Sequence, residues 1–239
     1  LGKQYSDPET FSSVIKFAKL LTENNKMSKN IVVVGAGISG LLAAYYLAKD
    51  GNKVTVYEQE RYPAMRTSFA NGGQVSVSNS EVWTTWSNVF KGIKWMFKKD
   101  APLLIRPTLE WAKIRWMSKF MWNTITEKYG RNTAETIQLG MESRALYKDI
   151  IAEEGLEFDQ SFRGILHFYK DKEYFSNAWA VKDMYESNGC EWTMLASNEI
   201  ENIEPNLING EIIGGAWTED DWMGDIHKFC TELSNVLKT

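Results

Sequence analysis

The chain has 239 residues, a formal charge of −4, 44% apolar and 24% charged side chains, and two cysteines. This length corresponds to one or two domains, and the composition excludes a disordered, collagen-like or disulfide-framework protein. The cysteines show no metal-binding spacing and there are only two histidines, so no metal site is expected. A reducing, cytoplasmic location is expected.

The charge is unevenly distributed along the chain. Residues 91–131 hold ten basic and three acidic side chains, a local charge of +7, which leaves −11 for the remainder. This asymmetry favours a local anionic partner surface. No nucleic-acid-binding module is visible, so nucleic acid is not an expected partner.

Two segments near the start need separate treatment. Residues 1–26 predict a helix that begins at Asp7-Pro8, and they are either an upstream extension or a helix docked on the domain. Residues 31–48 are uncharged and long enough to span a membrane, but their early glycines favour a strand, a tight turn and a helix.

Further along, hydrophobic periodicity and cap signals predict alternating elements. Strands are expected at 30–34, 53–57, 164–169, 191–195 and 211–217, and helices at 39–49, 86–99, 108–126, 132–154, 171–187, 197–203 and 226–237. Residues 59–82 are expected to form a polar loop. Asn132 and Glu135 suggest a capping box, Gly155 a helix stop, and Asp225 the cap of the last helix. The alternation indicates an α/β fold, with a βαβ-like series at 164–195.

The strongest motif is a GxGxxG turn between the first strand and the first helix. It consists of Gly35, Ala36, Gly37, Ile38, Ser39 and Gly40. Gly35 permits a tight turn, Gly37 lets a pyrophosphate approach the backbone, and Gly40 allows close helix–strand packing. Glu58 ends the next strand, where it can accept hydrogen bonds from a ribose and disfavours the 2′-phosphate of NADP. This order of parts predicts binding of an adenine dinucleotide.

The loop after the second strand also carries small polar residues. Hydroxyl, amide and glycine positions cluster within eight residues; they are Thr67, Ser68, Asn71, Gly72, Gly73 and Gln74. Such residues suit contacts to a pyrophosphate and a flat ring, but they equally suit a polar surface loop. The motif and the loop leave the choice between FAD and NAD open.

The combination of Val32-Val33-Val34-Gly35, Glu58 and the 67–74 pattern resembles the FAD-dependent D-amino acid oxidase-like superfamily. The stretches at 93–103, 204–205 and 224–225 are similar to the bacterial D-amino acid dehydrogenase small subunit. The resemblance implies a Rossmann-type FAD-binding domain with a parallel sheet and an inserted α+β substrate domain. It also implies oxidative deamination of D-amino acids to 2-oxo acids and ammonia, with electrons passed to a quinone-type acceptor. Arg61 joins the motif and loop residues above as a candidate FAD contact.

Family members are nearly twice as long, and their later part completes the FAD site and carries most substrate contacts. This chain therefore resembles an N-terminal half, and a second chain is one source of the missing part. The expected division is 1–26 as an extension, 27–85 as the first part of the FAD-binding domain, 86–217 as a substrate- or membrane-facing region, and 218–239 as a helix returning to the FAD-binding domain. A glycine, sarcosine or proline oxidase, a non-catalytic half and an NAD-dependent dehydrogenase are the alternatives.

No catalytic residue can be named from the sequence. A flavin amine oxidation needs an arginine that clamps the substrate carboxylate. Arg163 and Arg106 are available, although each is expected at the surface. His167 lies in a predicted strand and is expected to be an ordinary half-buried histidine.

Residues 91–122 interleave lysines with tryptophans. Trp95, Trp111, Trp116 and Trp122 alternate with basic residues, which include Lys91, Lys94, Lys98, Lys99, Lys113, Arg115 and Lys119. Basic helices with tryptophan suit an anionic membrane surface, which predicts a peripheral position on the inner face of the plasma membrane. The alternative, slightly preferred on sequence alone, is that the aromatics form a core between helices.

Overall fold

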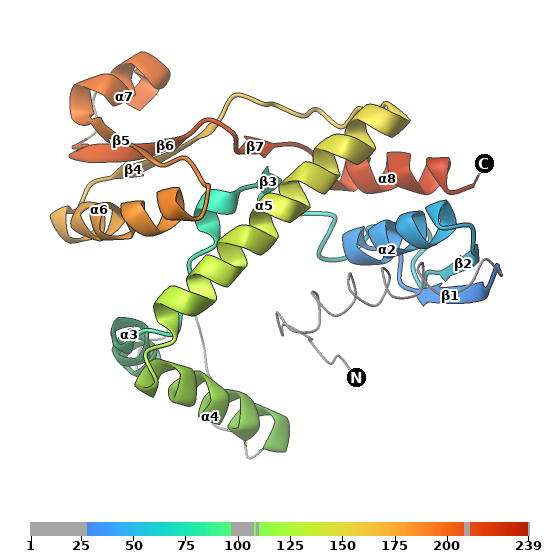
Figure 1. Cartoon of the computed structure of the whole chain (residues 1–239), viewed down its shortest axis with the longest axis horizontal. Helices are drawn as coiled ribbons and strands as arrows, with labels where there is room; N and C mark the ends of the chain where they lie inside the picture. The colour runs from blue at the N-terminus through green and yellow to red at the C-terminus, as the bar shows by residue number, and fades with distance from the viewer. Residues whose placement is uncertain (1–27, 97–107, 109, 208–210, 239) are drawn as a thin grey trace.

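A computed structural model describes residues 28–96, 108, 110–207 and 211–238 (Figure 1). The predicted helix within residues 1–26, the candidate Arg106 and the end of the 86–99 helix lie outside this part. Two hydrophobic cores pack against different stretches of one long helix, α5 (Tyr129–Glu154), which runs diagonally across the molecule.

The first end contains the predicted strand–turn–helix–strand unit. β1 (Asn30–Val34) and β2 (Lys53–Tyr57) pair in parallel, and α2 (Ile38–Lys49) connects them. Both strands match their predicted limits, and residues 31–48 are a strand, a turn and a helix. Alternate residues of each strand are exposed, so the described residues cover only one face of this sheet. None of the helices that the structure describes combines the length and apolar character needed to cross a bilayer.

The last helix packs against this unit. α8 (Ile226–Val236) begins at Asp225, whose side chain accepts a hydrogen bond from the Lys228 N–H at 3.0 Å, so the predicted cap is confirmed. Phe229 and Leu233 of α8 are fully buried in one cluster with Leu41 of α2. The chain thus returns at its end to the helix that carries the glycine motif.

The long helix α5 begins earlier than the sequence predicts. The Asn132 N–H donates to the Lys128 carbonyl at 2.9 Å, so the backbone is already helical there and the predicted cap at Asn132 is wrong. Glu135 instead forms an ion pair with Arg131. The predicted stop is confirmed, because Gly155 follows the helix in the left-handed conformation with φ 60°.

The opposite end is a three-stranded antiparallel sheet with the order β4-β6-β5. Its strands are β4 (Ile165–Tyr169), β5 (Thr193–Ala196) and β6 (Gly214–Thr218). The βαβ-like series is corrected in one respect: β6 lies between β4 and β5, which do not pair directly. α6 (Lys172–Ser187) packs on one face, and α7 (Ser197–Ile203) packs its buried Ile200 over Gly215; η2 (Pro205–Leu207) follows.

The segment expected to be a loop at 59–82 is partly regular. β3 (Gln74–Val75) pairs with β7 (Trp222–Met223), and the short 3-10 helix η1 (Val77–Asn79) follows β3. Sequence reasoning missed both because a two-residue strand has no periodicity of its own and depends on its distant partner. This segment joins the two ends of the molecule.

Two further helices lie at the lower end of α5. α3 (Trp86–Met96) and α4 (Trp111–Ile125) project there, away from both cores (Figure 1). α3 has no buried residue, and Thr124 is the buried residue of α4. The expectation that their aromatic side chains form a core between helices is therefore wrong.

Candidate functional site

The glycine motif forms a tight turn whose geometry requires glycine at two positions. Gly35 has φ 102°, a conformation that other residues rarely adopt. A Cβ atom on Gly40 would lie 2.0 Å from the Gly35 carbonyl oxygen, so only glycine lets α2 approach β1 this closely. A Cβ on Gly37 would meet only the Ser68 Oγ, at 3.4 Å. The side of Gly37 that points out of the turn is open.

Backbone N–H groups collect at the start of α2. The first bond inside the helix runs from the Leu41 N–H to the Gly37 carbonyl, and the Ile38 N–H donates to the Ser68 Oγ at 3.1 Å. The N–H groups of Ser39 and Gly40 have no hydrogen-bond partner among the described residues. Together with the helix dipole, these donors make the start of α2 suited to an anionic group.

Glu58 faces this turn. Its carboxylate accepts hydrogen bonds from the Ala36 N–H at 2.6 Å and from the Glu60 N–H at 3.0 Å. The backbone N–H of Glu60, and then that of Ala36, hold the pKa of Glu58 below its ordinary value. Glu58 is therefore an anchored carboxylate at neutral pH, at the position where the sequence predicts contact with a ribose.

A pocket of about 390 Å³ opens between the glycine turn and the loop after β2. It is lined by backbone and side chains from both strands and from that loop: Val34, Gly35, Gly37, Tyr57, Glu58, Gln59, Ala64, Met65, Arg66 and Ser68. Glycine backbone, a fixed carboxylate, a hydroxyl and a guanidinium thus surround one cavity. These groups fit the diphosphate and ribose of a dinucleotide.

Comparison with known proteins identifies the family to which the chain belongs. Residues 30–239 match the family model described as FAD dependent oxidoreductase, DAO. The chain belongs to this family. FAD is therefore the cofactor of the group, which decides the choice between FAD and NAD that the motif left open.

Individual relatives agree with the family. The chain is 48% identical over 206 residues to D-amino acid dehydrogenase 3 of Mesorhizobium japonicum, an alignment that covers 86% of this chain and 49% of that protein. It is 39% identical over 211 residues to a D-amino acid dehydrogenase of Paramagnetospirillum magneticum, an alignment that covers 85% of this chain and 49% of that protein. The chain thus spans about half the length of these relatives.

A solved structure shares the fold. The glycine oxidase of Bacillus cereus superposes with a TM-score of 0.58 at 16% identity, and the match covers 89% of this chain and 44% of that structure. The predicted α/β fold with a parallel sheet and a glycine turn is confirmed by the family and by this likeness.

The structure brings together only part of the predicted FAD contacts. Gly35, Gly37, Glu58 and Ser68 line the pocket. The other loop candidates lie elsewhere. Arg61 stacks over the Tyr62 ring at 5.2 Å, Thr67 is exposed, and Asn71, Gly72, Gly73 and Gln74 follow a path toward β7, where Gln74 is paired with Met223. Their role as FAD contacts stays a prediction.

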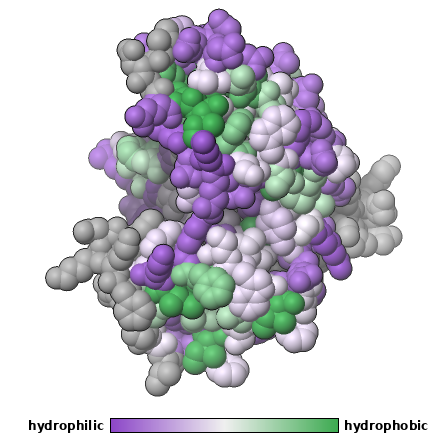
Figure 2. All heavy atoms as spheres, turned by 90° about the vertical axis from the view of Figure 1, so that its left-hand side faces the viewer, coloured by the Kyte–Doolittle hydropathy of each residue, from purple (hydrophilic) through white to green (hydrophobic). Residues whose placement is uncertain are grey.

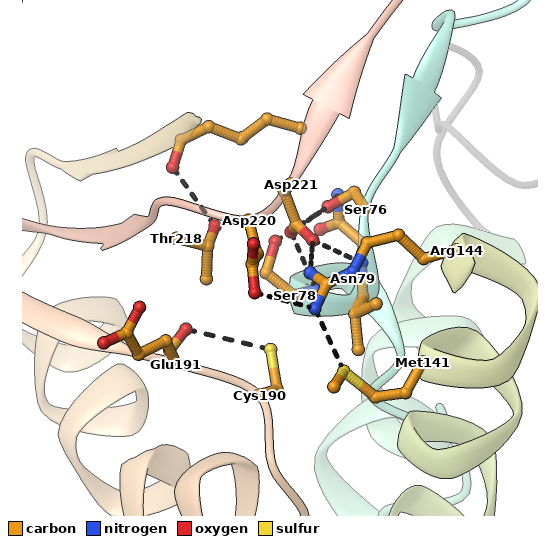
Figure 3. Close-up of polar contacts among 12 residues, drawn as sticks. Ser76, Ser78, Asn79, Met141, Arg144, Cys190, Glu191, Thr218, Asp220 and Asp221 are labelled. Atoms are coloured by element: carbon orange, nitrogen blue, oxygen red, sulfur yellow. Dashed lines mark hydrogen bonds and ion pairs between the residues drawn. The ribbon is translucent and has the colours of Figure 1, made fainter. Parts of the chain in front are cut away.

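Sequence reasoning missed two sets of polar residues. Arg66 lines the pocket and contacts Glu60, yet an arginine in a polar loop gives no distinct signal. The second set is a buried ion pair between Arg144 of α5 and Asp221 before β7, with the Nη1–Oδ1 distance at 3.0 Å (Figure 3). Arg144 continues the apolar helical spacing from Ile137 and Met141, which was a usable sign of burial.

The candidate substrate residues have structural partners. The His167 Nε2 lies 2.7 Å from the Ser78 Oγ, its ring stacks on Trp192, and burial lowers its pKa. It is the half-buried histidine that the sequence predicts. Arg163 is exposed and contacts the Ser161 Oγ, as expected of a surface residue. Neither is placed as a carboxylate clamp.

Proposed function

We propose that this chain is the FAD-binding portion of an enzyme that deaminates D-amino acids oxidatively. The reaction converts the amino acid and water into a 2-oxo acid and ammonium, while two electrons and two protons pass to an acceptor. Bound FAD would supply the two-electron oxidation of the amine. A quinone is the proposed final acceptor. Support comes from the family, from the dehydrogenase names of the relatives, and from the pocket at the start of α2.

The residues of this chain would hold the cofactor by its diphosphate and ribose. The free N–H groups of Ser39 and Gly40 and the open side of Gly37 would receive the diphosphate. Glu58, already fixed by the Ala36 N–H, would accept hydrogen bonds from the adenosine ribose. The anchored Glu58 at an open helix start is the observation that carries the proposal.

The test is to express the chain, alone and together with the C-terminal half of a relative, and to identify any cofactor that is retained. A yellow protein that releases FAD, and that reduces a dye with D- but not L-amino acids, would support the full proposal. Glycine, sarcosine or proline as the preferred substrate would support the amine-oxidase alternative. Binding of NADH without flavin would contradict the assignment.

We further propose that a second segment, on a second polypeptide or on a longer form of this one, completes the nucleotide domain. Val34 is 85% and Tyr57 62% exposed, on the face of the β1–β2 sheet that the described residues leave uncovered. Parallel sheets are normally covered on both faces, and a sheet of two strands is only marginally stable by itself. The expected result is a colourless chain that becomes yellow only with the C-terminal half of a relative. A chain that binds FAD stoichiometrically alone would contradict this part.

The surface of α3 and α4 supports a second proposal, contact with an anionic membrane. Its exposed large apolar side chains include Trp86, Phe90, Ile93, Trp111, Trp116, Met117, Trp122 and Ile125. Basic side chains lie among them at Lys91, Lys94, Lys113, Arg115 and Lys119. The lower part of Figure 2, where α3 and α4 lie, shows green and near-white side chains interspersed with purple ones. Tryptophan with lysine on one surface suits the headgroup region of anionic lipid.

Vesicle flotation tests the membrane contact. The chain should float with phosphatidylglycerol vesicles at low salt, less at high salt, and little with neutral vesicles. Trp122→Ser on α4 should reduce flotation several-fold. The matched control is Trp179→Ser on α6, which removes a tryptophan of similar exposure (52% against 61%) from another surface. Equal loss in both variants, or binding insensitive to salt and lipid charge, would refute the contact.

A further inference from the structure

Two short segments are joined residue by residue in the middle of the molecule. The first, residues 73–78, begins within the candidate FAD loop (residues 67–74), and the second, residues 221–224, precedes α8. The Gly224 N–H donates to the Gly73 carbonyl at 2.8 Å, and β3 then pairs with β7. Beyond the strands, the Asp221 carboxylate accepts three hydrogen bonds, from the Val77 N–H (2.9 Å), the Ser78 N–H (3.0 Å) and the Ser76 Oγ (3.0 Å) (Figure 3).

Asp221 is fully buried, and its charge is balanced from one side. Arg144, 5% exposed, donates to its Oδ1 at 3.0 Å and also reaches the exposed Asp220 at 3.3 Å. A buried ion pair gains little net stability over apolar residues of similar size, because both charges lose water. The ion pair is better explained by a role in positioning, because a carboxylate that accepts hydrogen bonds from four donors allows only one register between the two segments.

The joined segments connect the candidate cofactor site to the rest of the fold. Gly73, near the end of the candidate FAD loop, has φ 62°, and a Cβ there would lie 2.5 Å from the Gly224 carbonyl oxygen. After Gly224 the chain enters α8, which packs on α2 and shares one buried cluster with Ala36 of the glycine turn. A slip between the segments would therefore displace the loop relative to the start of α2.

We propose that Asp221, held by Arg144, is a positioning residue that fixes residues 73–78 against residues 221–224 and thereby sets the candidate FAD loop. This inference rests on the proposed function, because the loop matters to FAD only if the chain binds it. Asp221 itself contacts neither the α2 turn nor the pocket lining in the described residues.

The test compares Asp221→Asn with Asp220→Asn. The first replaces an acceptor of N–H bonds by an amide of the same shape and leaves the Arg144 charge buried. The second removes the neighbouring charge from the same arginine without touching residues 73–78. Hydrogen exchange by mass spectrometry reads the protection of residues 73–78. Retention of FAD and the visible absorption of the flavin, with the C-terminal half of a relative added where needed, read the effect on the cofactor.

We expect exchange of residues 73–78 to accelerate about tenfold or more in Asp221→Asn, and FAD retention to fall about tenfold with a shifted flavin spectrum. Asp220→Asn should change each by less than about twofold. If Asp221→Asn does not fold, Ser76→Ala, which removes one bond to Asp221 and keeps the ion pair, should show smaller changes in the same direction.

Faster exchange with unchanged FAD retention and spectrum would show a merely structural role and overturn the proposal. Unchanged exchange in Asp221→Asn and Ser76→Ala would overturn it as well. A wild-type chain that retains no FAD even with the C-terminal half of a relative would refute the proposed function instead, and the exchange of residues 73–78 would then decide whether Asp221 fixes this segment.

Discussion

Gly40→Ala tests whether close packing of α2 on β1 depends on the third glycine of the motif. The new Cβ would lie 2.0 Å from the Gly35 carbonyl oxygen, about 1.4 Å short of ordinary contact at 3.4 Å. Gly35 cannot easily retreat, because its N–H is bonded to the Tyr57 carbonyl at 2.7 Å. Overpacking of this kind costs about 1–3 kcal/mol, which the helix preference of alanine offsets by up to about 1 kcal/mol.

We therefore expect Gly40→Ala to lower the free energy of unfolding by about 1–2 kcal/mol, measured by urea titration of tryptophan fluorescence. Gly130→Ala in the first turn of α5 is the matched control. Its Cβ would meet nothing within 4 Å, so the same substitution should be neutral or raise stability by up to about 1 kcal/mol. A Gly40→Ala protein as stable as the control would refute the packing argument.

Gly37→Ala separates cofactor binding from folding. It should change the free energy of unfolding by less than about 0.5 kcal/mol, because among the described residues the new Cβ meets only Ser68. It should weaken FAD retention at least about tenfold, because the same Cβ would occupy the open space at the start of α2 where the diphosphate is proposed to bind. Glu58→Gln should make the free energy of unfolding fall less steeply as the pH is lowered into the acid range. The folded pKa of Glu58 is lowered, so its contribution is present above the unfolded pKa and is lost as pH falls through the folded one, which urea titrations at successive pH values will show. Phe229→Ala should cost about 3–5 kcal/mol by the same titration, because the ring is fully buried and packs against Tyr147 of α5 and Phe158. Tyr45→Phe should cost about 1 kcal/mol, because the hydroxyl of this α2 residue donates to Glu154 of α5 at 2.7 Å; a neutral result would mean that α8 (for Phe229) or α2 (for Tyr45) is not packed against α5 as described.

The parts of the fold that the sequence predicts are those that local interactions determine. β1, β2 and α7 have the expected limits, because alternation, turn glycines and capping residues act within a few positions. Gly155 and Asp225 end and begin helices as expected for the same reason. Glu58 could be placed at the glycine turn because the spacing of a strand–helix–strand unit brings it there.

The parts that the sequence does not predict depend on distant partners. β3 exists because β7, nearly 150 residues later, supplies its hydrogen bonds, and Asp221 is buried because Arg144 faces it from another element. The exposure of the α4 tryptophans is a related case. Helical spacing shows which residues share a face, but it does not show whether another element covers that face.

The long helix α5 explains how the two ends of the molecule can act together. Tyr147 and Ile150 pack in the core beside α2, whereas Ile137 and Met141 pack in the core beneath the three-stranded sheet. Arg144 lies between these groups and binds Asp221 at the point where the chain crosses from one end to the other. A rotation of one end against the other would have to break a buried, fully bonded charge, which is costly. We therefore expect the ion pair to fix the orientation of the three-stranded sheet relative to the start of α2.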